Sequence, residues 1–259
     1  MPRASRTAAV LLASILLYAQ AASAADLTVL VSGAFTEAYT QLVPEFERAT
    51  KNKVTSAYGA SMGNAPDSIP MRLERGEPAD VVIVAASALD DLIKNGKVRA
   101  ESRTNLVRSS IGMVVRAGAP RPDISSVEAL KRTLLAAKSI AYSASASGVY
   151  ISTELFPRLG IADQMKAKSK RIESERVAAV VARGGAEIGF QQISELLPVP
   201  GVTYVGPLPP GAQQVTTFSA GITASSKNPD AAKALIAFLT SPTARPIIAK
   251  TGLEPVAPQ

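Results

Sequence analysis

Several short loops combine serine and glycine with other small residues, and this combination suits the binding of a small anion. The clearest is Ser143-Ala144-Ser145-Ala146-Ser147-Gly148, which follows an apolar stretch and precedes a predicted helix over 148–159. A helix start leaves backbone N–H groups unpaired and carries partial positive charge, and serine hydroxyls add neutral donors. An ordinary serine cap of a helix has the same pattern, so this run alone leaves both interpretations open.

The same arrangement recurs at three other predicted strand-to-helix junctions. They are Ser32-Gly33-Ala34, Gly59-Ala60-Ser61-Met62-Gly63 and, less clearly, Ser174-Glu175-Arg176-Val177. Ligands of open α/β sheets bind beyond the carboxyl ends of the strands, so loops of this kind converge on one crevice. We therefore predict that hydroxyl and N–H donors bind an anion there, with Arg176 as the arginine nearest to it.

The second of these loops also spells G-x-S-x-G, the nucleophile-elbow pattern of serine hydrolases. The chain has no histidine, so a Ser-His-Asp triad is excluded, and a histidine-free hydrolase using Ser61 is left as the alternative of another class. The absence of both histidine and cysteine also removes the usual ligands of zinc and copper. The sequence therefore favours binding without enzymatic activity, with no catalytic residue, no metal and no cofactor.

The N-terminus has the three parts of a secretory signal peptide. Arg3 and Arg6 form the basic part, 8–18 is apolar, and Ala22-Ser23-Ala24 is a small-residue cleavage site. The apolar part is shorter than the roughly 20 residues that span a bilayer. We therefore predict a signal peptide over 1–24 and a periplasmic mature protein. Because the chain has no cysteine, we expect neither a lipid anchor nor a disulfide.

Composition indicates a globular protein with a substantial core. Hydrophobic residues make up 47% of the chain and charged residues 19%, and the formal net charge is +7. A basic balance suits an anionic ligand. Because the lysines and arginines are scattered, with no basic block interleaved with aromatics, no nucleic-acid partner is expected.

Apolar runs and helical periodicities alternate along the whole chain. Strands are predicted over 26–31, 53–57, 81–84, 111–116, 139–142, 186–191, 202–205 and 215–223. The principal predicted helices cover 37–49, 88–95, 148–159, 177–183, 229–239 and 245–250, with further helices before 75 and within 123–138. This alternation predicts an α/β fold with mostly parallel sheets.

Four short motifs resemble the molybdate-binding proteins of ABC importers. They are Leu27-Thr28-Val29-Leu30, Gly76-Glu77-Pro78-Ala79-Asp80-Val81, Glu187-Ile188-Gly189-Phe190 and Lys227-Asn228-Pro229-Asp230-Ala231-Ala232. The resemblance implies a two-lobe periplasmic-binding-protein fold, with lobe one over 26–110 plus 217–259, lobe two over 111–216, and a two-strand hinge near 109–111 and 216–218. It also implies a monomeric receptor that delivers a small anion to a membrane permease.

The resemblance also assigns ligand contacts to positions of this chain. The family's first binding serine falls near Ala34, where Ser32 is the alternative hydroxyl, and its second falls at Ser61, while its binding tyrosine falls at Gln192. Helix-start N–H groups fall within 145–147 and at Val177. The predicted ligand-binding residues are Ser32, Gly33, Ala34, Ser61, Met62, Ser145, Ser147, Arg176, Val177, Gln191 and Gln192.

Two of these positions depart from the family, since Ala34 has no hydroxyl and Gln192 replaces a tyrosine. The loop 64–68 that follows Ser61 is also extended. Two ligand classes therefore stay open: a molybdate- or tungstate-like oxyanion, and an organic polycarboxylate such as a di- or tricarboxylate.

Overall fold

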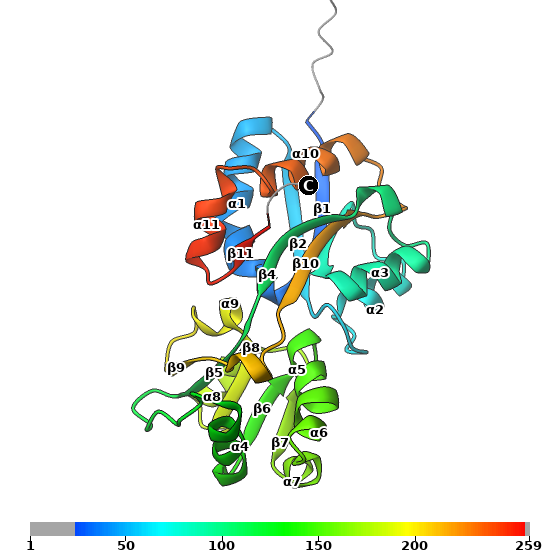
Figure 1. The fold of residues 1–259 in the computed structure, drawn as a ribbon. Coiled ribbons are helices and arrows are strands. Elements are labelled where there is room, and N and C mark those ends of the chain that lie inside the picture. The colour runs from blue at the N-terminus through cyan, green and yellow to red at the C-terminus, as the bar shows by residue number, and fades with distance from the viewer. Residues whose placement is uncertain (1–23, 257–259) are drawn as a thin grey trace, which may run out of the picture.

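The computed structural model describes residues 24–256, which form two α/β lobes, one above the other in Figure 1. The predicted α/β fold with two lobes is confirmed, although strand pairing within each sheet is mixed. Residues 1–23 of the predicted signal peptide lie outside the described residues. No helix among residues 24–256 has the length and apolar character needed to cross a membrane.

The first lobe is built on a six-stranded sheet with the order β11-β4-β10-β3-β1-β2. Its strands are β1 (Asp26–Ser32), β2 (Lys53–Gly59), β3 (Val81–Ala85), β4 (Thr104–Ser109), β10 (Thr216–Ile222) and β11 (Glu254–Pro255). β1 pairs in parallel with β2 and β3, whereas β10 runs antiparallel to β3 and β4. The parallel strands β1 and β2 therefore end at the same edge, which faces the second lobe.

Helices cover both faces of this sheet. Along β3 the buried side chains alternate, so that Ile83 packs on one helical layer and Val82 and Val84 pack on the other. The first layer contains α1 (Gly33–Thr50), α10 (Pro229–Leu239) and α11 (Ala244–Lys250). The second contains α2 (Ile69–Glu74) and α3 (Ala86–Lys94), and η1 (Ala100–Ser102) precedes β4.

The second lobe is built on a five-stranded sheet with the order β7-β6-β8-β5-β9. Its strands are β5 (Ile111–Arg116), β6 (Ile140–Ser143), β7 (Ser169–Ile172), β8 (Ile188–Gln192) and β9 (Val202–Pro207). β6 pairs in parallel with β7 and β8, and β5 is antiparallel to β8 and β9. β6 and β8 therefore end together, opposite the first lobe.

The helices of the second lobe also lie on both sides of its sheet. One side carries α4 (Val127–Ala136), α5 (Ala146–Tyr150), η2 (Ile151–Leu155), α6 (Phe156–Arg158) and α7 (Ala162–Lys166). The other carries α8 (Val177–Ala182) and α9 (Ile193–Leu196), and η3 (Pro210–Ala212) lies between β9 and β10. Ser126 caps α4 by accepting a hydrogen bond from the Ala129 N–H.

Two chain segments connect the lobes (Figure 1): β4 continues into β5 through Ser110, and the segment after β9 leads into β10. The Gln213 side chain ties these segments together, since its amide accepts a hydrogen bond from the Ile111 N–H at 2.8 Å and donates one to the Ile111 carbonyl at 2.9 Å. The predicted hinge positions near 109–111 and 216–218 fall at the β4–β5 junction and at the start of β10.

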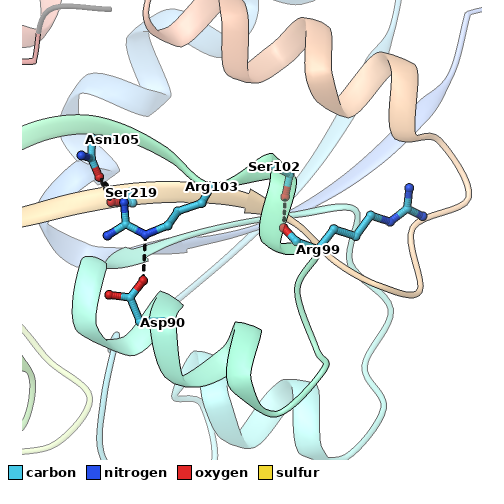
Figure 2. Close-up of polar contacts among 6 residues, drawn as sticks. All are labelled: Asp90, Arg99, Ser102, Arg103, Asn105 and Ser219. Carbon is cyan, nitrogen blue, oxygen red and sulfur yellow. Dashed lines mark hydrogen bonds and ion pairs between the residues drawn. The ribbon is translucent and has the colours of Figure 1, made fainter. Parts of the chain in front are cut away.

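A polar cluster fixes the start of β4 within the first lobe (Figure 2). Arg103 pairs with Asp90 of α3 at 2.7 Å, and the Ser219 hydroxyl on β10 donates to Asn105 at 2.8 Å. These contacts hold the start of β4 against α3 and β10. Because the ion pair is substantially exposed, it contributes about 0–1 kcal/mol to stability. The cluster involves no residue that lines the cavity described below, so Arg103 is a suitable control position.

Three helical elements differ from the sequence-based expectation in ways that matter for function. α1 begins at Gly33, four residues before the predicted start, which brings Ser32 to its N-cap. Helix α9 was not predicted, and it directly follows β8. The predicted helix over 148–159 begins at Ala146 and contains a π-helical turn over Ile151–Leu155.

Candidate functional site

A cavity of about 300 Å³ lies between the two lobes, at the edge where β1, β2, β6 and β8 end. Seven of the eleven predicted binding residues line it: Ser32, Gly33, Ser145, Ser147, Arg176, Gln191 and Gln192. They come from both lobes and from four separate strand-to-helix junctions. The strand-to-helix junctions that were predicted to converge on one crevice therefore do lie around a single cavity.

The other four predicted residues do not line this cavity. Ala34 is buried, and its carbonyl accepts a hydrogen bond from the Ser194 hydroxyl at 2.7 Å. Val177 is buried, and its N–H donates to the Gln191 side chain at 2.8 Å. Ser61 lies behind Ser32, and Met62 packs against the apolar clusters of the first lobe. These residues shape the site from behind.

The serine predicted to bind through the G-x-S-x-G loop instead supports another serine. Ser61 Oγ accepts a hydrogen bond from the Ala85 N–H at 2.9 Å and donates its own proton to Ser32 Oγ at 2.9 Å. The Ser32 hydroxyl thus accepts a hydrogen bond from Ser61, and its own O–H remains free to donate to a ligand. Since hydrogen bonds in a chain polarise one another, this relay strengthens Ser32 as a donor to a ligand.

Serines of the second lobe line the opposite wall. Ser147 shares a hydrogen bond with Ser143 at 3.1 Å, and both side chains are buried. The neighbouring Gly148 lies directly against the end of β6, where an added Cβ would lie 1.6 Å from the Ser143 carbonyl oxygen. Only glycine permits this approach. The close packing of α5 onto β6 therefore sets the positions of Ser145 and Ser147 at the cavity wall.

Arg176 is the one basic side chain among the described residues that line the cavity. The two acidic residues on either side of Ser174 form ion pairs away from Arg176: Glu173 with Arg171 at 3.4 Å, and Glu175 with Arg183. Because these carboxylates are engaged, the Arg176 guanidinium stays available to an anionic ligand.

The Gln192 amide also has unused bonding capacity. Its Nε2 group donates to Thr216 Oγ1 at 3.2 Å, and its Oε1 atom is buried with no hydrogen-bond partner among the described residues. A buried polar atom without a partner is costly, so a polar ligand in the cavity gains from meeting it. Both glutamines line the cavity because Gln192 is the last residue of β8, where the chain turns into α9.

The most unusual cavity residue, Glu195 on α9, was not among the predicted ones. Its carboxylate oxygen Oε1 accepts a hydrogen bond from Gln191 Nε2 at 2.7 Å. It also lies against the first turn of α1, since a Cβ added at Gly33 would be only 2.2 Å from Oε1. The Glu195 side chain is half-buried, at the wall of the cavity between the two lobes.

Burial raises the pKa of the Glu195 carboxyl to about 7, against opposing effects of the Arg176 charge and of the Gln191 hydrogen bond. Near neutral pH this group therefore exchanges readily between its protonated and ionised forms. A carboxyl group with a pKa near the working pH, located in a cleft, is suited to act as a general acid or base.

The raised pKa predicts a pH-dependent gain in stability for Glu195→Gln. The folded protein favours the protonated carboxyl, so wild-type stability falls as pH rises from about 4.5 to about 7. A shift of this size corresponds to at most about 3 kcal/mol, and partial exposure reduces it to about 1–2 kcal/mol. We expect the variant to melt a few degrees higher at pH 8 and equally at pH 4. A pH-independent difference in melting temperature would contradict this.

Further cavity residues were missed by sequence reasoning. They include Thr36, Tyr58, Asp67 and Phe218 from the first lobe. Tyr58 lies near the end of β2 and Phe218 near the start of β10, and both add apolar wall. The one available signal for Glu195 was an acidic residue directly after a strand that ends in two glutamines.

Direct contacts hold the lobes together around the cavity. The Ser174 hydroxyl donates to Asp67 Oδ1 at 2.9 Å at the cavity edge, and the Ser194–Ala34 bond connects α9 to α1. The extended loop after Ser61 thus reaches the second lobe. Among residues 24–256, no group of three or more acidic residues is arranged to hold a metal ion.

Comparisons with known proteins point to the same fold. The molybdate-binding protein ModA of Azotobacter vinelandii is 28% identical over 252 residues, covering 91% of this chain and 92% of the relative. The solved periplasmic molybdate-binding protein of A. vinelandii matches with a TM-score of 0.71 and 21% identity, covering 90% of this chain and all of that one. The sulfate-binding protein SubI of Mycobacterium tuberculosis matches with a TM-score of 0.70 and 19% identity, covering 90% of this chain and 87% of that one.

One relative corrects an expectation. An aconitate isomerase of a Pseudomonas species is 48% identical over 251 residues, which is 97% of this chain and 95% of the relative. The expectation that the chain binds without being an enzyme is therefore wrong, because a protein this similar along its whole length is named for a reaction. The resemblance to molybdate-binding proteins is confirmed. A family model for bacterial extracellular solute-binding proteins matches residues 27–254, and the chain belongs to this family.

Proposed function

We propose that the protein is an isomerase of the aconitate isomerase type, which binds an unsaturated tricarboxylate between its lobes and moves a proton on it. The observation that carries the proposal is Glu195, a half-buried carboxyl with a pKa of about 7 in a cavity that also presents serine hydroxyls and the Arg176 guanidinium. The 48% identical aconitate isomerase supplies the substrate class.

The chemistry of the substrate explains why one carboxyl group is sufficient. In aconitate, a carbon bearing a carboxylate is joined to a CH= group on one side and to a CH2 group on the other. Glu195 removes a proton from the CH2 carbon, so that the C–H bond breaks, an O–H bond forms, and the electron pair spreads over three carbons. The same carboxyl returns the proton to the former CH= carbon, and the new double bond takes the geometry in which the cleft holds the substrate. No electrons are gained or lost overall.

The other cavity residues support this proposal as holders of the three carboxylates. The Ser32 and Ser147 hydroxyls offer neutral donors from opposite lobes, and the Arg176 guanidinium offers a charged one. Donors fixed around the carboxylates also stabilise the negative charge that spreads onto them when the proton is removed. Tyr58 and Phe218 border the carbon skeleton with apolar surface.

A tetrahedral oxyanion suits the cavity less well. The volume of about 300 Å³ is at the lower end of the range for organic ligands, well above what an ion with four oxygens fills. Two donors assigned by the resemblance are also engaged within the protein, the Val177 N–H with Gln191 and the Ser61 hydroxyl with Ser32. The organic polycarboxylate is therefore the ligand class that we propose.

We further propose that the protein is a periplasmic monomer, exported by the signal peptide predicted over 1–24. The proposed lobe boundaries are 26–110 plus 217–259 and 111–216, which leave the cleft free to open and close about the hinge. Membership of a family of extracellular solute-binding proteins supports this location, and a membrane permease remains its proposed partner for import.

The test is direct conversion. We expect purified protein to interconvert cis- and trans-aconitate, monitored by the distinct vinyl proton signals in ¹H NMR, and to do so without added metal or cofactor. A thermal-shift panel run beside it should show a higher melting temperature with aconitate or citrate than with molybdate, tungstate, sulfate or phosphate.

The two measurements distinguish the candidate roles. Stabilisation by aconitate without conversion would replace the isomerase by a receptor for polycarboxylates. Stabilisation by molybdate or tungstate alone would replace it by an oxyanion receptor.

A further inference from the structure

The orientation of the Gln191 side-chain amide is fixed from one side. Gln191 is buried at the end of β8, and its side-chain Oε1 atom accepts a hydrogen bond from the Val177 N–H at 2.8 Å. A backbone N–H can only donate, so the amide oxygen must face Val177 and the NH2 group must face away from it. On that side, Nε2 donates to Glu195 Oε1 at 2.7 Å.

The same oxygen of Glu195 is enclosed from the other lobe. An added Cβ at Gly33 would lie 2.2 Å from Oε1, so the first turn of α1 closes over this atom. The second oxygen, Oε2, has no hydrogen-bond partner among the described residues. The two oxygens of one carboxyl group therefore have different surroundings: Oε1 is held by the protein and Oε2 is not.

We propose that Gln191 is a positioning residue that holds Oε1 of Glu195, so that Oε2 is the atom that exchanges a proton with the substrate. Gln191 itself does not bind the ligand. The catalytic role of Gln191 rests on the proposed isomerase activity. The hydrogen bond from Gln191 to Glu195 does not depend on that activity.

The groups around Gln191 and Glu195 determine whether the pKa of Glu195 should rise or fall when Gln191 is replaced. The charged groups that line the cavity with Glu195 are Arg176, Asp67, Glu173 and Glu175, and the one whose charge lowers the pKa of Glu195 is Arg176. The Gln191 hydrogen bond also lowers it, since an N–H donor favours the ionised carboxylate. Removal of this donor should therefore raise the pKa of Glu195.

The test compares Gln191→Leu, which removes both hydrogen bonds, with Gln191→Glu, which keeps an acceptor for the Val177 N–H. Gln41→Leu is the matched control, because Gln41 is exposed on α1 and its amide bonds only to Glu37. The pKa of Glu195 is measured without substrate by ¹³C NMR of carboxyl-labelled glutamate, assigned by the signal that disappears in Glu195→Gln. The parameters kcat and KM for aconitate are measured across pH 5–9.

We expect Gln191→Leu to raise the pKa of Glu195 by about one and to lower kcat by about 10- to 100-fold, with KM changed less than about threefold. Gln191→Glu should retain activity at low pH, where its protonated carboxyl donates to Glu195. It should lose activity at high pH, where the second carboxyl also ionises, because the introduced side chain then no longer donates to Glu195 and repels it. Gln41→Leu should change none of these values.

Two results would overturn the inference. One is an unchanged Glu195 pKa in both Gln191 variants. The other is a raised KM with unchanged kcat, which would assign Gln191 to ligand binding. Because the NMR titration needs no turnover, a wild-type protein without isomerase activity would refute the proposed function and still allow the contact of Gln191 with Glu195 to be judged.

Discussion

Glu195→Gln is expected to lower the rate of aconitate isomerisation by about 10²- to 10⁴-fold, the usual contribution of a positioned general acid or base. Glutamine has nearly the shape of glutamate, and its side-chain oxygen can still accept the hydrogen bond from Gln191. It has no proton that can be exchanged with a carbon at neutral pH. The variant should therefore lose the reaction and keep the architecture of the cavity.

Binding should separate from catalysis in this variant. Ionised Glu195 repels a tricarboxylate, so the wild-type protein should bind aconitate more weakly as pH rises through about 7. Glu195→Gln removes that charge and should bind equally well across this range, as measured by calorimetry. Arg103→Ala, in the polar cluster away from the cavity, serves as the control and should retain wild-type activity. A Glu195→Gln protein with activity within about threefold of wild type would exclude Glu195 as the base.

The other acidic residues of the cavity are poorer candidates for this role. Glu175 forms two short hydrogen bonds with Arg183, and these lower the pKa of its carboxyl. Glu173 pairs with Arg171, and Asp67 accepts a hydrogen bond from Ser174. A carboxylate whose pKa is lowered, as that of Glu175 is, is a weak base. Glu195 differs because burial outweighs its two stabilising contacts.

Much of the fold followed from the sequence because its elements have strong local signals. The continuous apolar run of β3 requires cover on both faces, and 229–239 begins with proline and was predicted with its observed bounds. The start of α1 was missed because Gly33, Ala34 and Phe35 are not typical of a helix start. Its N-cap, Ser32, makes no side-chain capping bond, since its hydroxyl is engaged with Ser61.

The sequence predicted the location of the binding site better than it predicted which groups contact a ligand there. Small residues at the ends of strands located the crevice, because parallel strands of a sheet end together. The sequence does not show which donors are used within the protein. Ser61 and Val177 were reasonable donors by position, and the structure shows their groups bonded to Ser32 and Gln191. Such pairings depend on side chains that meet only after folding.

Glu195 illustrates the same limit for catalysis. Nothing in the local sequence raises the pKa of a glutamate in a short helix, and its shift arises from α1 of the other lobe closing over it. The cleft between the two lobes is lined by serine hydroxyls that can donate to a carboxylate. In the proposed isomerase, Glu195 adds to this cleft a carboxyl group with a pKa of about 7, which suits proton transfer.

Gly33→Ala is expected to lower isomerase activity by about 10²-fold without loss of stability. The new methyl group would lie 2.2 Å from Glu195 Oε1, so the carboxyl must move away by an ångström or more. The displaced atom is the end of a flexible side chain, so the fold tolerates the change at little cost. Alanine also loses less backbone entropy than glycine in a helix, which favours stability by about 0.5–1 kcal/mol. A misplacement of about 1 Å, in contrast, is costly for catalysis.

The decisive comparison places Gly33→Ala in the Glu195→Gln background. If the methyl group acts by displacing the Glu195 carboxyl, it should reduce the residual rate of Glu195→Gln less than about threefold, because interacting sites are not additive. A further hundredfold loss would instead show that Gly33 acts through Ser32 or the donors at the start of α1. Melting temperatures of all four proteins complete the cycle, since equal or higher values for Gly33→Ala exclude a folding defect as the cause of lost activity.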